Sequence, residues 1–205
     1  MKVELLSITP KPEKLIEIAG RTSFRSYQKM KKDSEIKFIK SLLKNNELSV
    51  LEHACASFKI SGVSRSFTHQ LVRHRLCSYT QQSQRHINES NFNYIEPKLI
   101  KENHIAHDIF MNIINKSKEA YLELQKLGIN NEDARFVLPN AVESQIVITA
   151  NFREWRHIIE LRGDKKAQWE IRIVIIEILK ILKKYAPTVF SDFDINDSDN
   201  LIIKI

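Results

Sequence analysis

The sequence predicts an α+β protein with a small, mainly antiparallel sheet, on three observations. Apolar residues recur at helical spacing in several long segments, whereas other segments alternate in polarity or are rich in β-branched residues. The two kinds of segment follow one another without a regular strand–helix–strand rhythm, which argues against a parallel α/β sheet. The chain has 205 residues and contains no repeat or linker-like tract, so we expect a single compact domain over residues 1–205.

The first third of the chain is predicted to hold a strand and two helices. Val, Leu and Ile dominate Lys2–Thr9, which is typical of a strand, and Pro12 can open a helix that continues through Ala19. Asp33 is a good N-cap for the next helix, which carries apolar residues at helical spacing and ends near Asn45.

The middle of the chain is predicted to contain a strand followed by a helix. Ala54–Ser61 alternates in polarity, and Gly62 is expected to end that strand. The apolar spacing over Val63–Arg75 then predicts a helix. Three polar residues would share one face of that helix: Gln70, Arg73 and His74.

The second half of the chain alternates long helical patterns with one strand pattern. In order we expect a helix over Glu102–Leu127 stopped by Gly128, a short helix from Asn130 that includes Arg135, a strand over Val142–Ala150, a helix capped by Asn151, and a buried helix over Lys166–Tyr185.

Charge and cysteine usage limit the partners and the compartment. The net charge is +7 and the isoelectric point is near 9.3, which favours an anionic ligand. Cys55 and Cys77 form no disulfide framework, as is usual in a reducing cytoplasm. The apolar runs are too short to span a bilayer, so no membrane association is expected.

The polar stretch from Gln70 to His86 is predicted to bind an anion. It contains Arg73, Arg75 and Arg85, and each guanidinium offers a planar fork that matches phosphate or carboxylate oxygens. Nucleic acid is the alternative ligand, but helix-turn-helix, zinc-finger and RNP patterns are missing. A small phosphorylated ligand is therefore favoured.

Other residue clusters in the sequence also have ordinary structural explanations. His104 and His107 have helical spacing but lack further ligands, so exposed histidines are favoured over a metal site. Arginines near Cys77 could activate a thiolate, but packing is the favoured role for this residue. A charged surface and a binding site explain a second polar set about equally well: Asn151, Arg153, His157 and Arg162.

Several motifs in sequence order resemble those of the flavin-dependent thymidylate synthases. These are Arg73-His74-Arg75 followed by Ser83 (R-H-R-x7-S), Arg135 to Pro139 (A-R-x-x-L-P), Asn151 to Arg153 (N-x-R), Leu161-Arg162 (L-R), and Ala167 to Ile171 (A-Q-W-E-I). The resemblance covers the chain from about Arg21 to Phe190.

The resemblance implies an α+β homotetramer with active sites at subunit interfaces. The implied reaction converts dUMP to dTMP, with 5,10-methylenetetrahydrofolate as the one-carbon donor and NADPH-reduced FAD as the hydride carrier. The family uses no cysteine nucleophile, which agrees with the packing role favoured above for Cys77. A nucleotide- or nucleic-acid-binding module on the same scaffold, without catalysis, is the alternative.

The resemblance also assigns roles by position. It implies that Arg162 is catalytic; no metal is expected, because His104 and His107 lack further ligands. The residues expected to bind dUMP are Gln70, Arg73, Gln81, Gln82, Ser83, Gln84, Arg85, Arg135 and Arg162. Those expected to bind FAD are Ser49, Arg73, His74, Arg75, Gln81, Asn151, Arg153 and His157. The chain departs from many members at Gln81, where they carry Glu, at Gln84, where they carry Gly, and at His157, where Asn is common.

Overall fold

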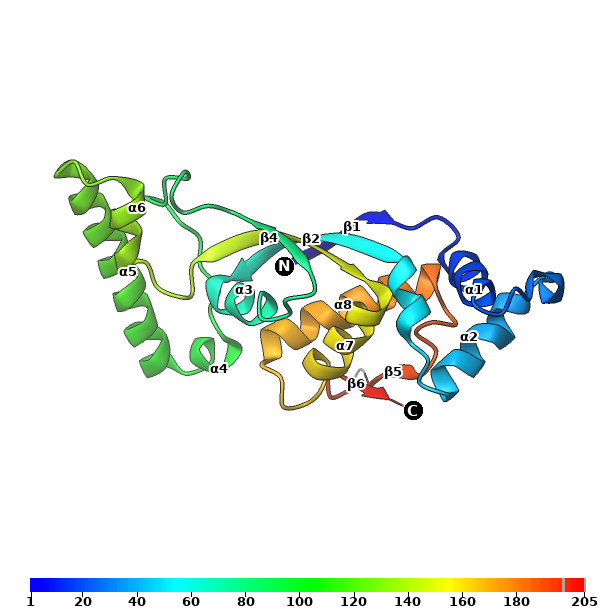
Figure 1. Ribbon diagram of the computed structural model, residues 1–205. Coiled ribbons are helices and arrows are strands. Elements are labelled where there is room, and N and C mark those ends of the chain that lie inside the picture. Colours follow the sequence, from blue (N-terminus) through cyan, green and yellow to red (C-terminus); the bar gives the residue numbers. More distant parts are fainter. Residues whose placement is uncertain (197, 205) are drawn as a thin grey trace. The chain divides into compact units, whose positions relative to one another are not determined.

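The computed structural model describes residues 1–196 and 198–204. It contains a four-stranded sheet with the strand order β1-β2-β4-β3 (Figure 1). The class is α+β, as predicted. The strands of this sheet are β1 (Lys2–Ile8), β2 (Cys55–Ser64), β3 (Ser78–Gln81) and β4 (Glu143–Asn151). The α-helices are α1 (Pro12–Thr22), α2 (Ser34–Lys44), α3 (Arg65–Leu71), α4 (Lys98–Lys101), α5 (His104–Lys126), α6 (Asn131–Ala134), α7 (Phe152–Arg162) and α8 (Trp169–Tyr185).

The chain divides into two compact units, and strands of the sheet contribute to both. Unit 1 comprises Met1–Lys2, Ser61–Gln70 and Thr80–Ile146, and unit 2 comprises Val3–Ile60, Leu71–Tyr79 and Val147–Ile205.

Unit 2 is built around α7 and α8, which pack against one another (Figure 1). α8 is apolar nearly all round and is buried along most of its length, as predicted. α7 is attached to β2 through Trp155, whose indole Nε1–H donates to the Ala56 carbonyl at 3.1 Å. The Trp155 ring meets Phe58 edge to face, with centroids 5.2 Å apart. Burying each of these rings contributes on the order of 2–3 kcal/mol to the stability of the fold. These contacts pack the buried face of α7 firmly against β2.

Unit 1 contains a separate apolar cluster around the long helix α5. Phe92, Ile114 and Val142 form its buried centre, with Tyr94 and Phe110 packed against it. Asn103 caps α5 by accepting the Ala106 N–H at 3.1 Å. Gly128 follows the helix with φ +82°, the left-handed conformation that suits a glycine after a helix end.

Two predicted boundaries in the middle of the chain were wrong. Gly62 does not end the strand: β2 continues to Ser64, and Gly62 lies within it with φ +68°. The helix predicted over Val63–Arg75 is only α3, Arg65–Leu71, because the chain turns at its end and the His74 N–H donates to the Leu71 carbonyl. Arg73 and His74 therefore do not share a helix face with Gln70.

A C-terminal hairpin was missed from sequence. β5 (Phe193–Asn196) and β6 (Leu201–Lys204) pair antiparallel. The Ile202 N–H donates to the Gly163 carbonyl directly after α7. A side chain at Gly163 would come within 2.6 Å of Ile202 Cδ1, so this glycine allows the close contact. None of the described helices combines the length and the apolar character that crossing a membrane requires.

The remaining short elements are 3₁₀ turns. They are η1 (Tyr27–Lys29), η2 (Ser49–His53) and η3 (Arg135–Val137).

Candidate active site

The polar face of α7 carries four of the residues assigned from sequence. Asn151 caps this helix as predicted, because its side-chain oxygen accepts the Glu154 N–H at 2.9 Å. Phe152, Trp155, Ile158 and Ile159 are buried on the opposite face. Arg153 and His157 are left exposed, and Arg162 is half-buried at the last turn.

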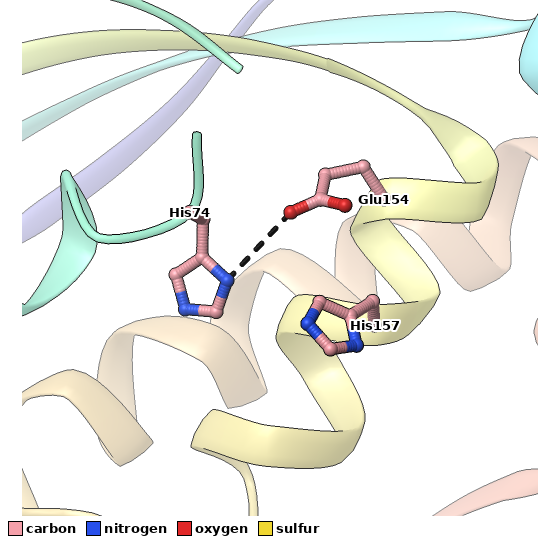
Figure 2. Close-up of side chains that lie close together, drawn as sticks. All are labelled: His74, Glu154 and His157. Atoms are coloured by element: carbon pink, nitrogen blue, oxygen red, sulfur yellow. Dashed lines mark ion pairs between the residues drawn. The ribbon is translucent and has the colours of Figure 1, made fainter. Parts of the chain in front are cut away.

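His74 faces α7 from the turn that follows α3 (Figure 2). Its side chain is buried, with 5% of the residue exposed. The Tyr79 hydroxyl lies 2.7 Å from the Leu71 carbonyl and 2.9 Å from the His74 carbonyl, and its single proton is shared between these two ends of the turn. The backbone that presents the imidazole is therefore anchored. The neighbouring Arg73 and Arg75 are exposed.

Four side chains of unit 2 meet at this point. The Arg162 Nε–H donates to His74 Nε2 at 2.9 Å. The other ring nitrogen, His74 Nδ1, lies 3.7 Å from a carboxylate oxygen of Glu154. The His157 ring approaches the His74 ring nearly at right angles, with centroids 5.8 Å apart. Glu154 was not singled out from sequence, because only the folded chain brings it to His74.

The surroundings of His74 favour the neutral imidazole. Burial, followed by the charges of Arg162 and His157, lowers its pKa from 6.5 to about 4. Burial raises the pKa of the nearby Glu154 carboxyl, and His157 partly offsets this. Arginine remains protonated in proteins, so His74 Nε2 must offer its lone pair to Arg162. The single ring proton of the neutral histidine is then on Nδ1, on the side of Glu154.

The same cluster resembles a metal site in composition. His74, Glu154 and His157 could each offer one ligand atom, and these atoms lie within 4.8 Å of one another. In the tautomer described above, however, neither nitrogen of His74 has a free lone pair: Nε2 accepts from Arg162 and Nδ1 carries the proton. The Arg162 guanidinium beside the ring further disfavours a cation. A hydrogen-bonded histidine fits this arrangement better than a ligand does.

Cys77 lies on the same segment as His74 but is poorly suited to be a nucleophile. Burial is the main effect that raises the pKa of its thiol to about 11, while a hydrogen bond with Tyr79 acts in the opposite direction. The thiol is therefore protonated at neutral pH. The packing role that the sequence favoured agrees with this environment.

Two pockets of unit 2 adjoin the polar face of α7. One has a volume of about 560 Å³, and its lining includes Asn151, Arg153 and His157. The other has about 330 Å³ and is lined by Ser49, Arg153 and neighbouring residues. Arg153 belongs to both pockets and is held by Glu52, whose carboxylate lies 2.6 Å from its NH1. Most of the residues assigned to FAD thus gather within unit 2.

Most of the residues assigned to dUMP lie in unit 1. Gln81 donates through Nε2 to Thr68 Oγ1 at 2.8 Å and to Ser144 Oγ at 3.3 Å. The Ser83 hydroxyl accepts from the backbone N–H groups of Arg85 and His86, so it stabilises the turn that follows β3. Gln84 is buried, and Gln70 donates to the Ser66 carbonyl at 3.3 Å.

Arg85 is engaged by an acidic residue of the same unit. Its Nε lies 2.6 Å from Glu132 Oε2, and both side chains are well exposed. Arg85 and Glu132 also line a pocket of about 550 Å³. An exposed pair of this kind contributes only about 0–1 kcal/mol, so an anionic ligand can displace the carboxylate at little cost.

Arg65 was missed by the sequence reasoning. It begins α3, and its NH1 donates to the Gln82 carbonyl at 3.3 Å. Burial and the charge of Arg135 lower the pKa of its guanidinium, while Glu89 acts in the opposite direction. Two cations that repel one another are suited to hold an anion between them. No sequence pattern singles out Arg65, because the predicted helix places it in the first turn without a partner.

Comparison with known proteins agrees with these observations. The family model described as "Thymidylate synthase complementing protein" matches residues 4–188. The flavin-dependent thymidylate synthase of Geobacter sulfurreducens is 39% identical over 200 residues, covering 94% of this chain and 86% of the relative. That of Corynebacterium glutamicum is 39% identical over 200 residues, covering 89% and 80% respectively.

A third relative shows a similar degree of identity. The flavin-dependent thymidylate synthase of Pyrococcus abyssi is 40% identical over 194 residues, covering 90% of this chain and 80% of the relative. The motifs of the sequence, the family match and these relatives agree, and the chain belongs to the family of flavin-dependent thymidylate synthases.

Proposed function

We propose that the protein converts dUMP to dTMP with 5,10-methylenetetrahydrofolate as the one-carbon donor and NADPH as the reductant of its FAD. The family membership establishes a flavin-dependent enzyme that methylates dUMP. The identities of the one-carbon donor and of the reductant go beyond what family membership establishes. The basic charge of the chain, +7, suits three anionic partners: a nucleotide, a folate and a nicotinamide cofactor.

The flavin site is proposed on the polar face of α7. Asn151, Arg153 and His157 line the 560 Å³ pocket, and they provide an amide, a guanidinium and an imidazole. Such donors suit the phosphate and ring acceptors of FAD. Ser49 adds a hydroxyl in the adjoining pocket, and further residues are proposed on the same ligand: Arg73, His74, Arg75 and Gln81. When bound, FAD supplies the hydride that reductive methylation requires.

The nucleotide site is proposed on the polar run that follows β3. Arg85 and Arg135 would hold the dUMP phosphate as charged forks, with Ser83 as a hydroxyl donor. Arg65 joins this proposal because its guanidinium donates to the Gln82 carbonyl in this polar run, and because burial and then the charge of Arg135 lower its pKa. The remaining residues proposed for dUMP are Gln70, Arg73, Gln81, Gln82 and Gln84.

Arg162 is proposed as the catalytic residue. A guanidinium beside the uracil ring stabilises the negative charge that develops when N3 ionises, and the ionised ring is a better carbon nucleophile. The bond to His74 fixes the Nε edge of Arg162, which limits the orientations that this side chain can adopt.

Residues 1–205 are proposed to act as one domain in a homotetramer with shared sites. One family model spans both units, which supports a single functional domain. Unit 1 exposes an apolar row on α5, where Ile105, Ile109 and Ile113 are 75%, 62% and 54% exposed. Exposed apolar rows of this kind are typical of surfaces that associate. The free cysteines support a reducing, cytoplasmic location.

The strongest support for the proposal is that the residues assigned to FAD on α7 line one pocket. Rescue of a thymidine-requiring strain that lacks thymidylate synthase tests the activity. We expect the wild-type chain and the exposed-cation control Lys184→Ala to rescue, and Arg162→Ala to fail. The purified protein should be yellow with flavin absorption bands. A flavin-loaded, well-expressed protein that does not rescue would contradict the proposed reaction and favour a binding module.

A further inference from the structure

We propose that His74 is a positioning residue for Arg162 and that Glu154 selects the tautomer of His74 that makes this possible. The inference rests on the proposed catalytic role of Arg162. It assigns to His74 a function beyond lining the flavin site, and it assigns a function to Glu154, which the motifs do not single out.

The contact between His74 and Arg162 joins two distant parts of the chain within unit 2. The Arg162 Nε–H points at His74 Nε2 over 2.9 Å, across a sequence separation of 88 residues. Arg162 lies at the last turn of α7, where a long side chain has many rotamers. A buried acceptor at a fixed place selects among these rotamers.

The acceptor itself is held from two sides. Tyr79 donates to the carbonyls of Leu71 and His74, which fixes the turn that carries the ring. The His157 ring packs against the imidazole on the α7 side, with ring centroids 5.8 Å apart. His74 is thus part of a rigid support for Arg162.

Glu154 acts on the other nitrogen of the ring. The 3.7 Å between its carboxylate oxygen and His74 Nδ1 is longer than a hydrogen bond, so the effect is electrostatic. A negative charge beside Nδ1 favours the proton at that position, which leaves the lone pair of Nε2 for Arg162. Glu154 is 6% exposed, so solvent screens this interaction only weakly.

Protonation of the ring would remove the support. An imidazolium has no lone pair to accept from Arg162 and would repel it. The titratable and charged groups around the ring are Glu154, His157 and Arg162 on α7, and Cys77 and Tyr79 on its own segment. The lowered pKa of His74 agrees with a ring that remains neutral at physiological pH.

Three variants separate positioning from flavin binding. His74→Leu removes the acceptor, whereas His74→Gln retains an oxygen acceptor near the position of Nε2. Glu154→Gln removes the charge and leaves the helix cap intact, because the cap uses the Glu154 backbone N–H. We expect His74→Leu to lower kcat about 10- to 100-fold, since small misplacements of a catalytic group can cost about 10²-fold. His74→Gln should recover most of kcat, and Glu154→Gln should show a smaller loss.

A double-mutant cycle decides whether His74 acts through Arg162. If it does, adding His74→Leu to Arg162→Ala has little further effect on kcat at equal flavin occupancy. If the two losses multiply, His74 acts independently and the inference is overturned, while the role of Arg162 stands. Near-normal turnover of Arg162→Ala would instead contradict the proposed function, and the inference with it.

A spectroscopic measurement tests the tautomer without using activity. In the ¹⁵N NMR spectrum of wild-type protein, His74 should show a protonated Nδ1 and an accepting Nε2 from pH 8 to pH 5. A protonated Nε2 in His74 at pH 8 would overturn the inference even if His74→Leu proved too unstable to assay.

Discussion

Asn151 is expected to serve two roles that can be separated by substitution. Its oxygen accepts the Glu154 N–H and caps α7, and the residue also lines the pocket proposed for flavin. Asn151→Ser retains an oxygen acceptor for the cap but removes the amide donor. Asn151→Ala removes both.

The expected magnitudes follow from these contacts. Loss of a cap bond costs about 1 kcal/mol, which lowers Tm by about 2–4 °C in a chain of this size. Loss of one donor to a ligand costs about 1 kcal/mol, or about a fivefold increase in Kd. Asn151→Ser should therefore keep Tm and weaken flavin binding, whereas Asn151→Ala should lower Tm and weaken flavin binding.

Differential scanning fluorimetry of flavin-free protein and flavin fluorescence titration give the two quantities. Asn103→Ala is a matched control, because Asn103 caps α5 in the same way but has no proposed ligand. It should lower Tm and leave the flavin Kd unchanged. Unchanged flavin affinity in Asn151→Ser would refute the second role of Asn151, and an unchanged Tm in Asn151→Ala would refute the first.

Three further outcomes are expected. The unfolded chain protonates His74 below about pH 6.5, but the native chain does so only near pH 4. The free energy of unfolding should therefore fall as the pH drops through this window, by up to roughly 3 kcal/mol. Chemical denaturation from pH 7 to pH 4 should show that the free energy of unfolding depends less on pH in His74→Gln than in the wild type. Cys77→Ser should retain turnover, and iodoacetamide should label Cys77 slowly at pH 8, because its pKa of about 11 leaves little thiolate. Gly62→Ala should lower Tm more than Gly128→Ala does in thermal melts. Both glycines have positive φ, but only at Gly62 would the added Cβ meet other atoms, because it would lie 2.8 Å from Met1 N.

Local signals were sufficient to predict α7 and its cap. Asn151 stands directly before residues at helical apolar spacing, and both the cap and the buried face depend on neighbours within a few positions. The buried helix α8 was predicted for the same reason. The candidate residues on α7 were therefore placed correctly on one helix.

The helix after β2 was predicted too long because its end depends on a contact from outside the predicted helical segment. Apolar spacing continues past Leu71, but the Tyr79 hydroxyl bonds to the Leu71 and His74 carbonyls in a turn. A pattern within Val63–Arg75 contains no information about that hydroxyl. The position of His74 opposite Glu154 could not be predicted for the same reason.

The C-terminal hairpin was missed because its strands are too short to carry a clear pattern: Phe193–Asn196 alternates over only four residues, and Leu201–Lys204 does not alternate. Each has four residues, and their stability depends on pairing with each other and on the contact of Ile202 with Gly163. Lys204 of this hairpin lies 2.9 Å from Glu160 on α7, and both residues line the larger pocket of unit 2. Part of the candidate site thus comes from a segment whose strand patterns are too short to be recognised from sequence.

The discontinuity of unit 2 affects how the protein folds during synthesis. β2 leaves the ribosome early, but the bonds from Phe152 N–H to the Ala54 carbonyl and from Trp155 to the Ala56 carbonyl need residues made about a hundred positions later. Contacts this distant in sequence slow folding, and the apolar side chains of β2 are exposed until α7 emerges. Nascent chains shorter than about 160 residues should depend on chaperones to avoid aggregation.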